Sequence, residues 1–393
     1  MYCFMPIPDA KPSHRELNPL TSSQYTETAP SDYPSHQTNK LMTTQSFHIG
    51  ERPIGIDFPP YLIAELSGNH NKSIERSRKI LQHAASSGAD AIKLQTYTPD
   101  TMTLNVKTDE FYISDKNSPW YGRYLYELYE DAFTPWEWHE ELMHEAHRLG
   151  LAFFSTPFDE TAVDFLETLN VPAYKISSFE NTDIPLLRKV AQTGKPLIIS
   201  CGLINLEELE ETVAAVQSAG CNNFALLKCT TSYPASVTDS NLSTISDMRN
   251  RFGCEVGLSD HTLGIASALT AIGQGASIIE KHLTLSRADG GVDATFSMEP
   301  SEFDSLTTEA KNAWLSLGTV HYGPTASESE TIKSRRSIYV AEDLVQGHIV
   351  TERDIRRIRP GNGLAPIHYD NLLGKRTTRN IPKGTPASWD LFS

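Results

Sequence analysis

The sequence predicts a (β/α)8 TIM barrel followed by a small C-terminal domain. Three observations lead to this prediction: eight short apolar runs recur along the chain, an amphipathic helical stretch follows most of them, and short strands with turns replace this pattern from Arg336 onward. The eight runs begin near residues 61, 90, 151, 173, 196, 224, 255 and 277. Eight strand-helix units over roughly 270 residues match the length of such a barrel.

An open, doubly wound sheet is the alternative fold. A nucleotide-binding sheet of that kind normally carries a Gly-rich phosphate turn after its first strand. Here the first run ends in Ala64-Glu65-Leu66-Ser67, and neither a GxGxxG motif nor a Walker loop occurs in the chain. The barrel is therefore the preferred interpretation.

Composition divides the chain into four parts. Residues 1–50 are rich in Pro, Ser, Thr and Asn without a sustained apolar period, which is typical of a disordered tail. We expect the barrel over residues 51–322, a polar linker over 323–335 and the C-terminal domain over 336–393. An insert at residues 98–132 holds seven aromatic side chains. This density predicts either a lid or protein interface, or a satellite core under a long loop.

Charge and composition exclude several classes of protein. The chain has 49 Asp and Glu against 34 Lys and Arg, so its net charge of −15 argues against nucleic-acid and anionic-membrane partners. No run reaches the roughly 18 to 20 apolar residues of a membrane helix, and no secretory signal pattern is visible. The five cysteines form no CxxC pair, so neither a disulfide framework nor a thiolate zinc site is indicated. We expect a cytoplasmic protein.

Polar residues at the C-terminal ends of barrel strands line the active site of a TIM barrel. The predicted strand ends carry Glu65, Lys93, Gln95, Thr156, Lys175, Ser178, Ser259, His261, Glu280 and His282. Lys93 and Lys175 predict a site for an anionic substrate, although each lysine could instead pair with a neighbouring carboxylate. Glu65 is a candidate general acid or base, or an anchor for Lys93, and burial would raise its pKa while lysines would lower it.

Two histidines are expected on adjacent strand ends. Side chains alternate along a strand, so His261 shares a face with Ser259, and His282 shares one with Glu280 on the neighbouring strand. Two imidazoles with oxygen donors suit Mn²⁺, Fe²⁺, Co²⁺ or Zn²⁺. The alternative is that each histidine is a hydrogen-bonded rim residue.

These residues lie in stretches that resemble the sialic acid synthase family, whose members condense phosphoenolpyruvate with an amino sugar to form nine-carbon sugar acids. The matching stretches are IAELSGNHN, GADAIKLQTYTPDTMTL, FFSTPFDETAVDFLE, VPAYKISSFE, GLSDHTLG and IIEKHLTLSRADGGVDATFSMEP. The segment RSIYVAEDLVQGHIVTERDIRRIRPGNGLAP is similar to that family's antifreeze-like (SAF) domain. Within the family, IAELSGNHN, TPWEWHEELM and LLKCTTSYPA are most similar to the pseudaminic acid branch.

The resemblance implies roles for individual residues. It implies catalytic roles for Glu65, His261, His282 and Asp293, with the two histidines as ligands of a divalent cation, Mn²⁺ with Mg²⁺ or Co²⁺ as alternatives. The phosphoenolpyruvate site then comprises Lys93, Thr156, Lys175, Ser178 and Ser259. The sugar contacts are expected from Asn69, Asn71, Gln95 and Arg359. It also implies a homodimer in which the SAF domain of one subunit caps the partner barrel and brings Arg359 to the sugar.

The expected reaction joins phosphoenolpyruvate, water and 2,4-diacetamido-2,4,6-trideoxy-β-L-altropyranose to give pseudaminic acid and phosphate. N-acetylneuraminate and legionaminate synthesis are the alternatives within the family. A more remote alternative is a non-catalytic scaffold whose C-terminal domain binds carbohydrate. That scaffold would be expected to lack a lysine, histidine or arginine at a matched position, and none is missing.

Overall fold

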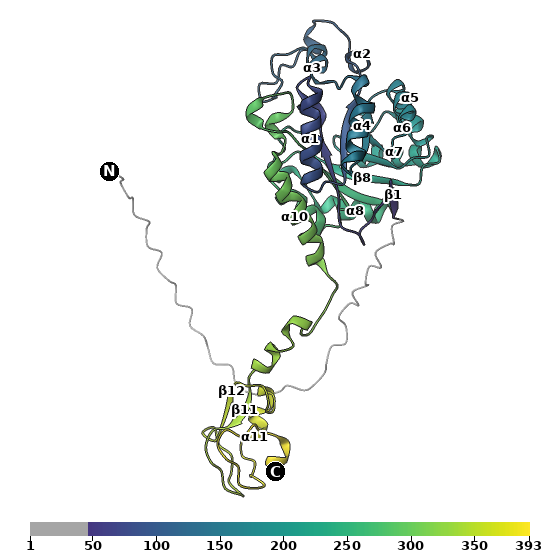
Figure 1. Ribbon diagram of the computed structural model, residues 1–393. Helices are drawn as coiled ribbons and strands as arrows, with labels where there is room; N and C mark the ends of the chain where they lie inside the picture. The colour runs from purple at the N-terminus through teal and green to yellow at the C-terminus, as the bar shows by residue number, and fades with distance from the viewer. Residues whose placement is uncertain (1–45) are drawn as a thin grey trace, which may run out of the picture.

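The computed structural model describes residues 46–393 and contains a closed barrel of eight parallel strands (Figure 1). The strands follow one another around the barrel in chain order, and the last one pairs with the first. They are β3 (Tyr61–Glu65), β4 (Ala91–Thr96), β5 (Ala152–Pro157), β6 (Tyr174–Ile176), β7 (Leu197–Ser200), β8 (Phe224–Cys229), β9 (Glu255–Asp260) and β10 (Ile278–His282). The predicted TIM barrel is confirmed. The tail expected for residues 1–50 lies, up to residue 45, outside the described residues.

Helices surround the barrel on its outside (Figure 1). They are α1 (Ile74–Ser86), α4 (His139–Arg148), α5 (Glu160–Thr168), α6 (Ile184–Ala191), α7 (Leu206–Ser218), α8 (Ser243–Phe252), α9 (Ala266–Gly273) and α10 (Pro300–Leu317). Several begin at a capping side chain: Ser73 accepts from the Arg76 amide, Asp159 from the Ala162 amide, and Asn205 forms a capping box. No helix within residues 46–393 is long and apolar enough to cross a membrane.

A short hairpin precedes the barrel. Strands β1 (Phe47–Ile49) and β2 (Arg52–Ile54) pair antiparallel, so ordered structure begins before the boundary expected at residue 51. Phe47, Ile49 and Ile54 are buried and belong to the same hydrophobic core as the barrel. Because these side chains alternate with exposed or half-buried ones, the hairpin packs one face against the barrel.

The aromatic insert at residues 98–132 is ordered. It contains α2 (Pro99–Met102) and α3 (Leu125–Ala132), and Tyr112 forms an isolated antiparallel bridge with Tyr124. Figure 1 shows the insert at one end of the barrel, beside the loops that follow the strands. The insert therefore adds a wall to the end of the barrel at which the strands terminate.

The C-terminal domain has its own hydrophobic core. Its strands β11 (Ser337–Val340) and β12 (Ile355–Ile358) pair antiparallel, and α11 (Tyr369–Leu372) packs beside them. Every residue from 315 to 336 is exposed, and Figure 1 shows this domain apart from the barrel, joined by that segment. The expected linker at residues 323–335 lies inside this exposed segment.

Candidate active site

A cavity of about 490 Å³ opens where the barrel strands end. Side chains from seven strands and from the turn after β3 line it, namely Ser67, Lys93, Gln95, Thr156, Lys175, Ser200, Cys229, Ser259, Glu280 and His282. This convergence arises because parallel strands of a closed barrel all terminate at the same end. All of the polar residues predicted at strand ends except Glu65 therefore line one cavity.

Two lysines and two glutamates form a buried ionic network at this cavity: Lys93, Lys175 and Glu280 line it, and Glu65 contacts Lys93 without lining the cavity itself. The Lys93 ammonium lies 2.6 Å from Glu65 Oε2 and 3.9 Å from Glu280 Oε2, and it donates to Thr156 Oγ1 at 3.1 Å. The Lys175 ammonium lies 3.6 Å from Glu280 Oε1 and donates to Ser200 Oγ at 2.6 Å. Each of the four charged side chains is at most 6% exposed. Glu280 thus faces both lysines, whereas Glu65 pairs with Lys93 alone.

Burial and pairing give these groups different pKa values. Burial raises the pKa of Glu65 to about 7, although Lys93 opposes the shift. For Glu280, the attraction of Lys175 and Lys93 outweighs the effect of burial, so its pKa is lowered. Burial lowers the pKa of Lys175, while both glutamates raise that of Lys93 against the effect of burial. Glu280 therefore remains ionised near neutral pH, and Glu65 can exchange a proton there.

Hydroxyl groups complete the cationic side of the cavity. Ser259 Oγ donates to Glu280 Oε1 at 3.0 Å, and Ser178 Oγ accepts from the Gly202 amide at 3.1 Å. A Cβ atom at Gly202 would lie 2.7 Å from that Ser178 oxygen, so glycine permits this close approach. Thr156, Ser178 and Ser259 all line the cavity together with the two lysines. The five residues predicted to bind phosphoenolpyruvate therefore lie together.

His261 and His282 lie next to each other at the end of this network, with ring centroids 5.4 Å apart. His261 Nδ1 lies 3.0 Å from the Thr230 carbonyl oxygen, which accepts its proton and leaves Nε2 as the available ligand atom. His282 Nδ1 is buried and has no hydrogen-bond partner among the described residues. Burial lowers the pKa of His282 well below its ordinary value, so the ring is neutral. A buried neutral imidazole with an unpartnered nitrogen fits a metal ligand.

Among residues 46–393, His261 and His282 are the only histidines that line this cavity. No group of three or more His, Cys, Asp or Glu residues within 46–393 has the geometry of a metal site. A cation bound by His261 and His282 would therefore need oxygen ligands from water or substrate, which is the open arrangement of catalytic metal sites.

Asp293 closes the cavity on the histidine side. Its carboxylate accepts hydrogen bonds from Ser67 Oγ and, at 3.2 Å, from the Gly68 amide. Burial raises the pKa of Asp293 against the effect of these two donors. Ser67 adopts a left-handed backbone conformation (φ 48°), which a non-glycine residue adopts at some cost in energy. The strained turn therefore places two donors on this carboxylate.

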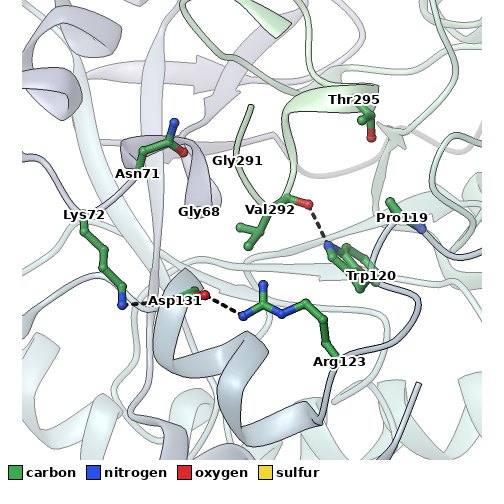
Figure 2. Close-up of a pocket in the computed structure, with 10 residues that line it drawn as sticks. All are labelled: Gly68, Asn71, Lys72, Pro119, Trp120, Arg123, Asp131, Gly291, Val292 and Thr295. Atoms are coloured by element: carbon green, nitrogen blue, oxygen red, sulfur yellow. Dashed lines mark hydrogen bonds and ion pairs between the residues drawn. The ribbon is translucent and has the colours of Figure 1, made fainter. Parts of the chain in front are cut away.

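Trp120 extends from the insert to the histidine pair. Its indole Nε1 donates to the Val292 carbonyl oxygen at 2.6 Å, next to Asp293 (Figure 2). Its ring packs against Tyr233 and Phe296 at centroid distances of 5.3 and 6.5 Å. Tyr233 in turn contacts His261 at 4.5 Å, and Phe296 contacts His282 at 5.0 Å. The insert therefore forms an aromatic wall beside the histidines.

A second cavity of about 410 Å³ lies beside this wall and shares Trp120 and Val292 with the first. Within it, the Asp131 carboxylate of α3 bridges Lys72 and Arg123 (Figure 2). The Lys72 ion pair joins α3 to the turn that follows β3, whereas the Arg123 ion pair lies within the insert. The insert is thus attached to the barrel by side-chain contacts as well as through its two ends.

Not every predicted sugar-binding residue lies in the main cavity. Gln95 lines it, but Asn69 donates instead to the Leu283 carbonyl and Ser297 Oγ, at 3.1 and 2.8 Å. Asn71 borders the second cavity, where its amide donates to the Gly290 carbonyl at 3.1 Å. The asparagines therefore hold the turn after β3 to the chain that follows β10. Arg359 is exposed in the C-terminal domain.

Several lining residues had no role in the sequence-based prediction. They are Tyr97, Trp120, Glu180, Cys229, Tyr233, Glu280 and Phe296. Glu280 stood in the strand-end pattern, and its position two residues before His282 could have indicated a shared inward face. Trp120 and Phe296 come from loops, and no periodicity indicated which loop side chains enter the cavity.

The chain is similar to known proteins over most of its length. Residues 80–322 match the NeuB family model, and residues 335–393 match the SAF domain model. The chain is 40% identical to the pseudaminic acid synthase of Helicobacter pylori over 84% of this chain and 97% of that protein. It is 37% identical to the N,N'-diacetyllegionaminic acid synthase of Legionella pneumophila, over 87% and 97% of the two chains. The N-acetylneuraminic acid synthetase structure from Leptospira borgpetersenii superposes with a TM-score of 0.66 at 31% identity, covering 74% of this chain and 95% of that one.

Proposed function

The chain belongs to the NeuB family, and from that premise we propose that it makes pseudaminic acid and phosphate from phosphoenolpyruvate, water and 2,4-diacetamido-2,4,6-trideoxy-β-L-altropyranose. One observation carries this proposal above all: two buried lysines and a pair of adjacent histidines line the same cavity. An anionic substrate needs the first pair, and a polarised aldehyde needs the second.

The lysine side of the cavity suits phosphoenolpyruvate. Its phosphate and carboxylate would replace internal partners of Lys93 and Lys175, with Thr156, Ser178 and Ser259 as hydroxyl donors. Glu280 holds the two ammonium groups in place, since its two oxygens face one lysine each. Because the lysine and glutamate side chains themselves are buried, their charges act on the substrate with less screening than surface charges would.

Glu65 would then act during the condensation. Carbon 3 of phosphoenolpyruvate forms a bond to the sugar aldehyde carbon with the electrons of its enol double bond, and the aldehyde oxygen takes up the proton that is released when water adds at carbon 2. Positive charge develops at carbon 2, where the Glu65 carboxylate stabilises it; water then adds, and cleavage of the C-O bond releases phosphate. NeuB-family synthases are generally metal-dependent, and a divalent cation on His261 and His282, which we propose to be Mn²⁺, would polarise the aldehyde.

The apolar side chains near and within the insert favour binding of a sugar that carries several methyl groups. Met102, Ile113, Leu125 and Leu128 line the cavity opposite the charged strand ends. The proposed sugar carries two acetamido methyl groups and a methyl group at carbon 6, whereas N-acetylmannosamine carries one acetamido group and a hydroxyl group at carbon 6. An apolar wall gains free energy from each methyl group that it covers. This favours the diacetamido-trideoxy branch.

The proposed function is tested by measuring phosphate release from phosphoenolpyruvate with Mn²⁺ and one of four additions: the altrose-derived sugar, its legionaminic-pathway counterpart, N-acetylmannosamine, or no sugar. We expect release with the altrose-derived sugar alone. Release with another sugar only would retain the reaction and refute the substrate, and no release with any sugar would contradict the proposal as a whole.

The affinity for phosphoenolpyruvate is expected to depend on the protonation of Glu65. Above its pKa of about 7, the Glu65 carboxylate competes with the substrate for Lys93, so binding weakens as pH rises. The ratio of the dissociation constants of the wild type and a Glu65→Gln variant should rise up to about tenfold between pH 6 and pH 8. Fluorescence titrations of both proteins with the same ligand cancel the ionisation of the phosphate itself. A ratio independent of pH would contradict this role of Glu65.

A further inference from the structure

Lys281 and Asp260 form a buried ion pair on the face of the strands that points away from the cavity. Lys281 follows Glu280 and precedes His282, both of which line the cavity, so its side chain points to the opposite face. It is paired in register with Asp260 on β9, and the ammonium lies 2.8 Å from Asp260 Oδ2. The two side chains are 1% and 2% exposed.

The Lys281 ammonium uses all of its hydrogen-bonding capacity on one loop. Besides Asp260, it donates to the carbonyl oxygens of Thr262 and Gly264, at 2.7 and 3.0 Å. Asp260 Oδ1 accepts from the Thr262 amide at 2.9 Å. These four bonds enclose residues 260–264, and His261 lies inside the enclosed segment. The loop that presents His261 is therefore fixed by a single cation from β10.

We propose that Lys281 is a positioning residue that holds the backbone of His261 so that its ring meets His282 at a common cation. This rests on the proposed metal site. Lys281 and His282 are consecutive on β10, so one strand both carries the second histidine and fixes the first. Without the ammonium, Asp260 and two carbonyl groups would be left without their donor, and the loop would rearrange to reach water.

Strand β9, which ends at Asp260, offers a matched control at its other end. Glu255 begins β9, and the Arg249 guanidinium lies 3.0 Å from its carboxylate and donates to the Gly275 carbonyl at 2.7 Å. This pair is 4% and 1% exposed, so its burial matches that of the Lys281 pair. It lies at the end of β9 away from the cavity. Loss of either ion pair should destabilise the barrel, but only loss of the Lys281–Asp260 pair should affect the histidines.

The test is titration with Mn²⁺ alone, followed by the electron paramagnetic resonance signal of the free ion. We expect Lys281→Met to weaken Mn²⁺ binding by about 10- to 100-fold, as loss of an outer-sphere partner does in metal sites. Arg249→Met should bind Mn²⁺ as the wild type does, although both variants melt at lower temperature. Wild-type affinity in a folded Lys281→Met protein would overturn the inference.

Two further variants make the result decisive. If Lys281→Met does not fold, Asp260→Asn takes its place, because it keeps the side-chain shape while removing the charge that holds the ammonium, and it should also weaken binding. His261→Ala sets the baseline. If the His261→Ala variant binds Mn²⁺ as tightly as the wild type, the metal site itself is refuted. If His261→Ala binds weakly while Lys281→Met and Asp260→Asn bind as tightly as the wild type, only the positioning role is refuted.

Discussion

A His282→Ala variant should lose phosphate release and its dependence on added metal together. His282 is one of only two imidazoles facing each other in the cavity, and its Nδ1 has no hydrogen-bond partner within the described chain. Removing it leaves a single protein ligand, so the cation and its polarising effect on the aldehyde are lost. Several kcal/mol of transition-state stabilisation correspond to a rate decrease of at least about 10³-fold.

Steady-state assays over a series of Mn²⁺ concentrations, before and after exhaustive chelation, provide the measurement. His144→Ala is a suitable control, because His144 is exposed on α4 and only approaches Glu140. It should retain wild-type rates and the same response to the metal. Full activity of the chelated wild type would contradict the metal role of the histidine pair.

Mixing Arg359→Ala subunits with Glu65→Ala subunits is expected to restore activity that neither variant has alone. Arg359 lies in the C-terminal domain, which Figure 1 shows apart from the barrel of its own chain, beyond a segment exposed from residue 315 to 336. We propose that the domain caps the barrel of a second subunit. Residues 335–393 carry ten Lys and Arg against six Asp and Glu, whereas the whole chain has a net charge of −15. This difference in charge favours docking on an acidic barrel.

In such a dimer, one of the two sites in each mixed pair combines an intact Glu65 with an intact Arg359. Random exchange should therefore restore about a quarter of the wild-type rate. Exchange is followed with fluorescent labels on the two variants, and a mixture of Glu65→Ala with the double variant serves as the inactive control. Complete exchange without any recovered activity would show that Arg359 acts within its own chain or not at all.

The sequence was most informative where strands determine position. Lys93, Lys175 and His282 could be placed at one mouth because each lies within or at the end of an apolar run, and parallel strands of a barrel end together. The direction of the Glu65 pKa could not be predicted, since it depends on burial outweighing one lysine at 2.6 Å. That balance is a matter of three-dimensional packing.

Loops were harder to predict. Asn69 was expected at the sugar from the family resemblance, yet the short helix η1 (Ser67–His70) turns its amide toward Leu283 and Ser297. Trp120 belongs to an insert whose aromatic density was visible, but its contact with Val292 spans 172 residues of chain. No local pattern encodes such a pairing, because it depends on how the insert folds back over the barrel.

The C-terminal domain has a hydrophobic core of its own, separate from that of the barrel. The barrel core and the core around Ile338, Val340 and Leu391 share no buried side chain. Cooperative unfolding depends on shared packing, so the two parts can lose structure independently. A substitution that melts only the small domain would leave a native barrel with an intact cavity. If the domain caps a partner barrel as proposed above, such a protein would be abundant and inactive, and a stability screen that follows only the barrel would classify it as normal.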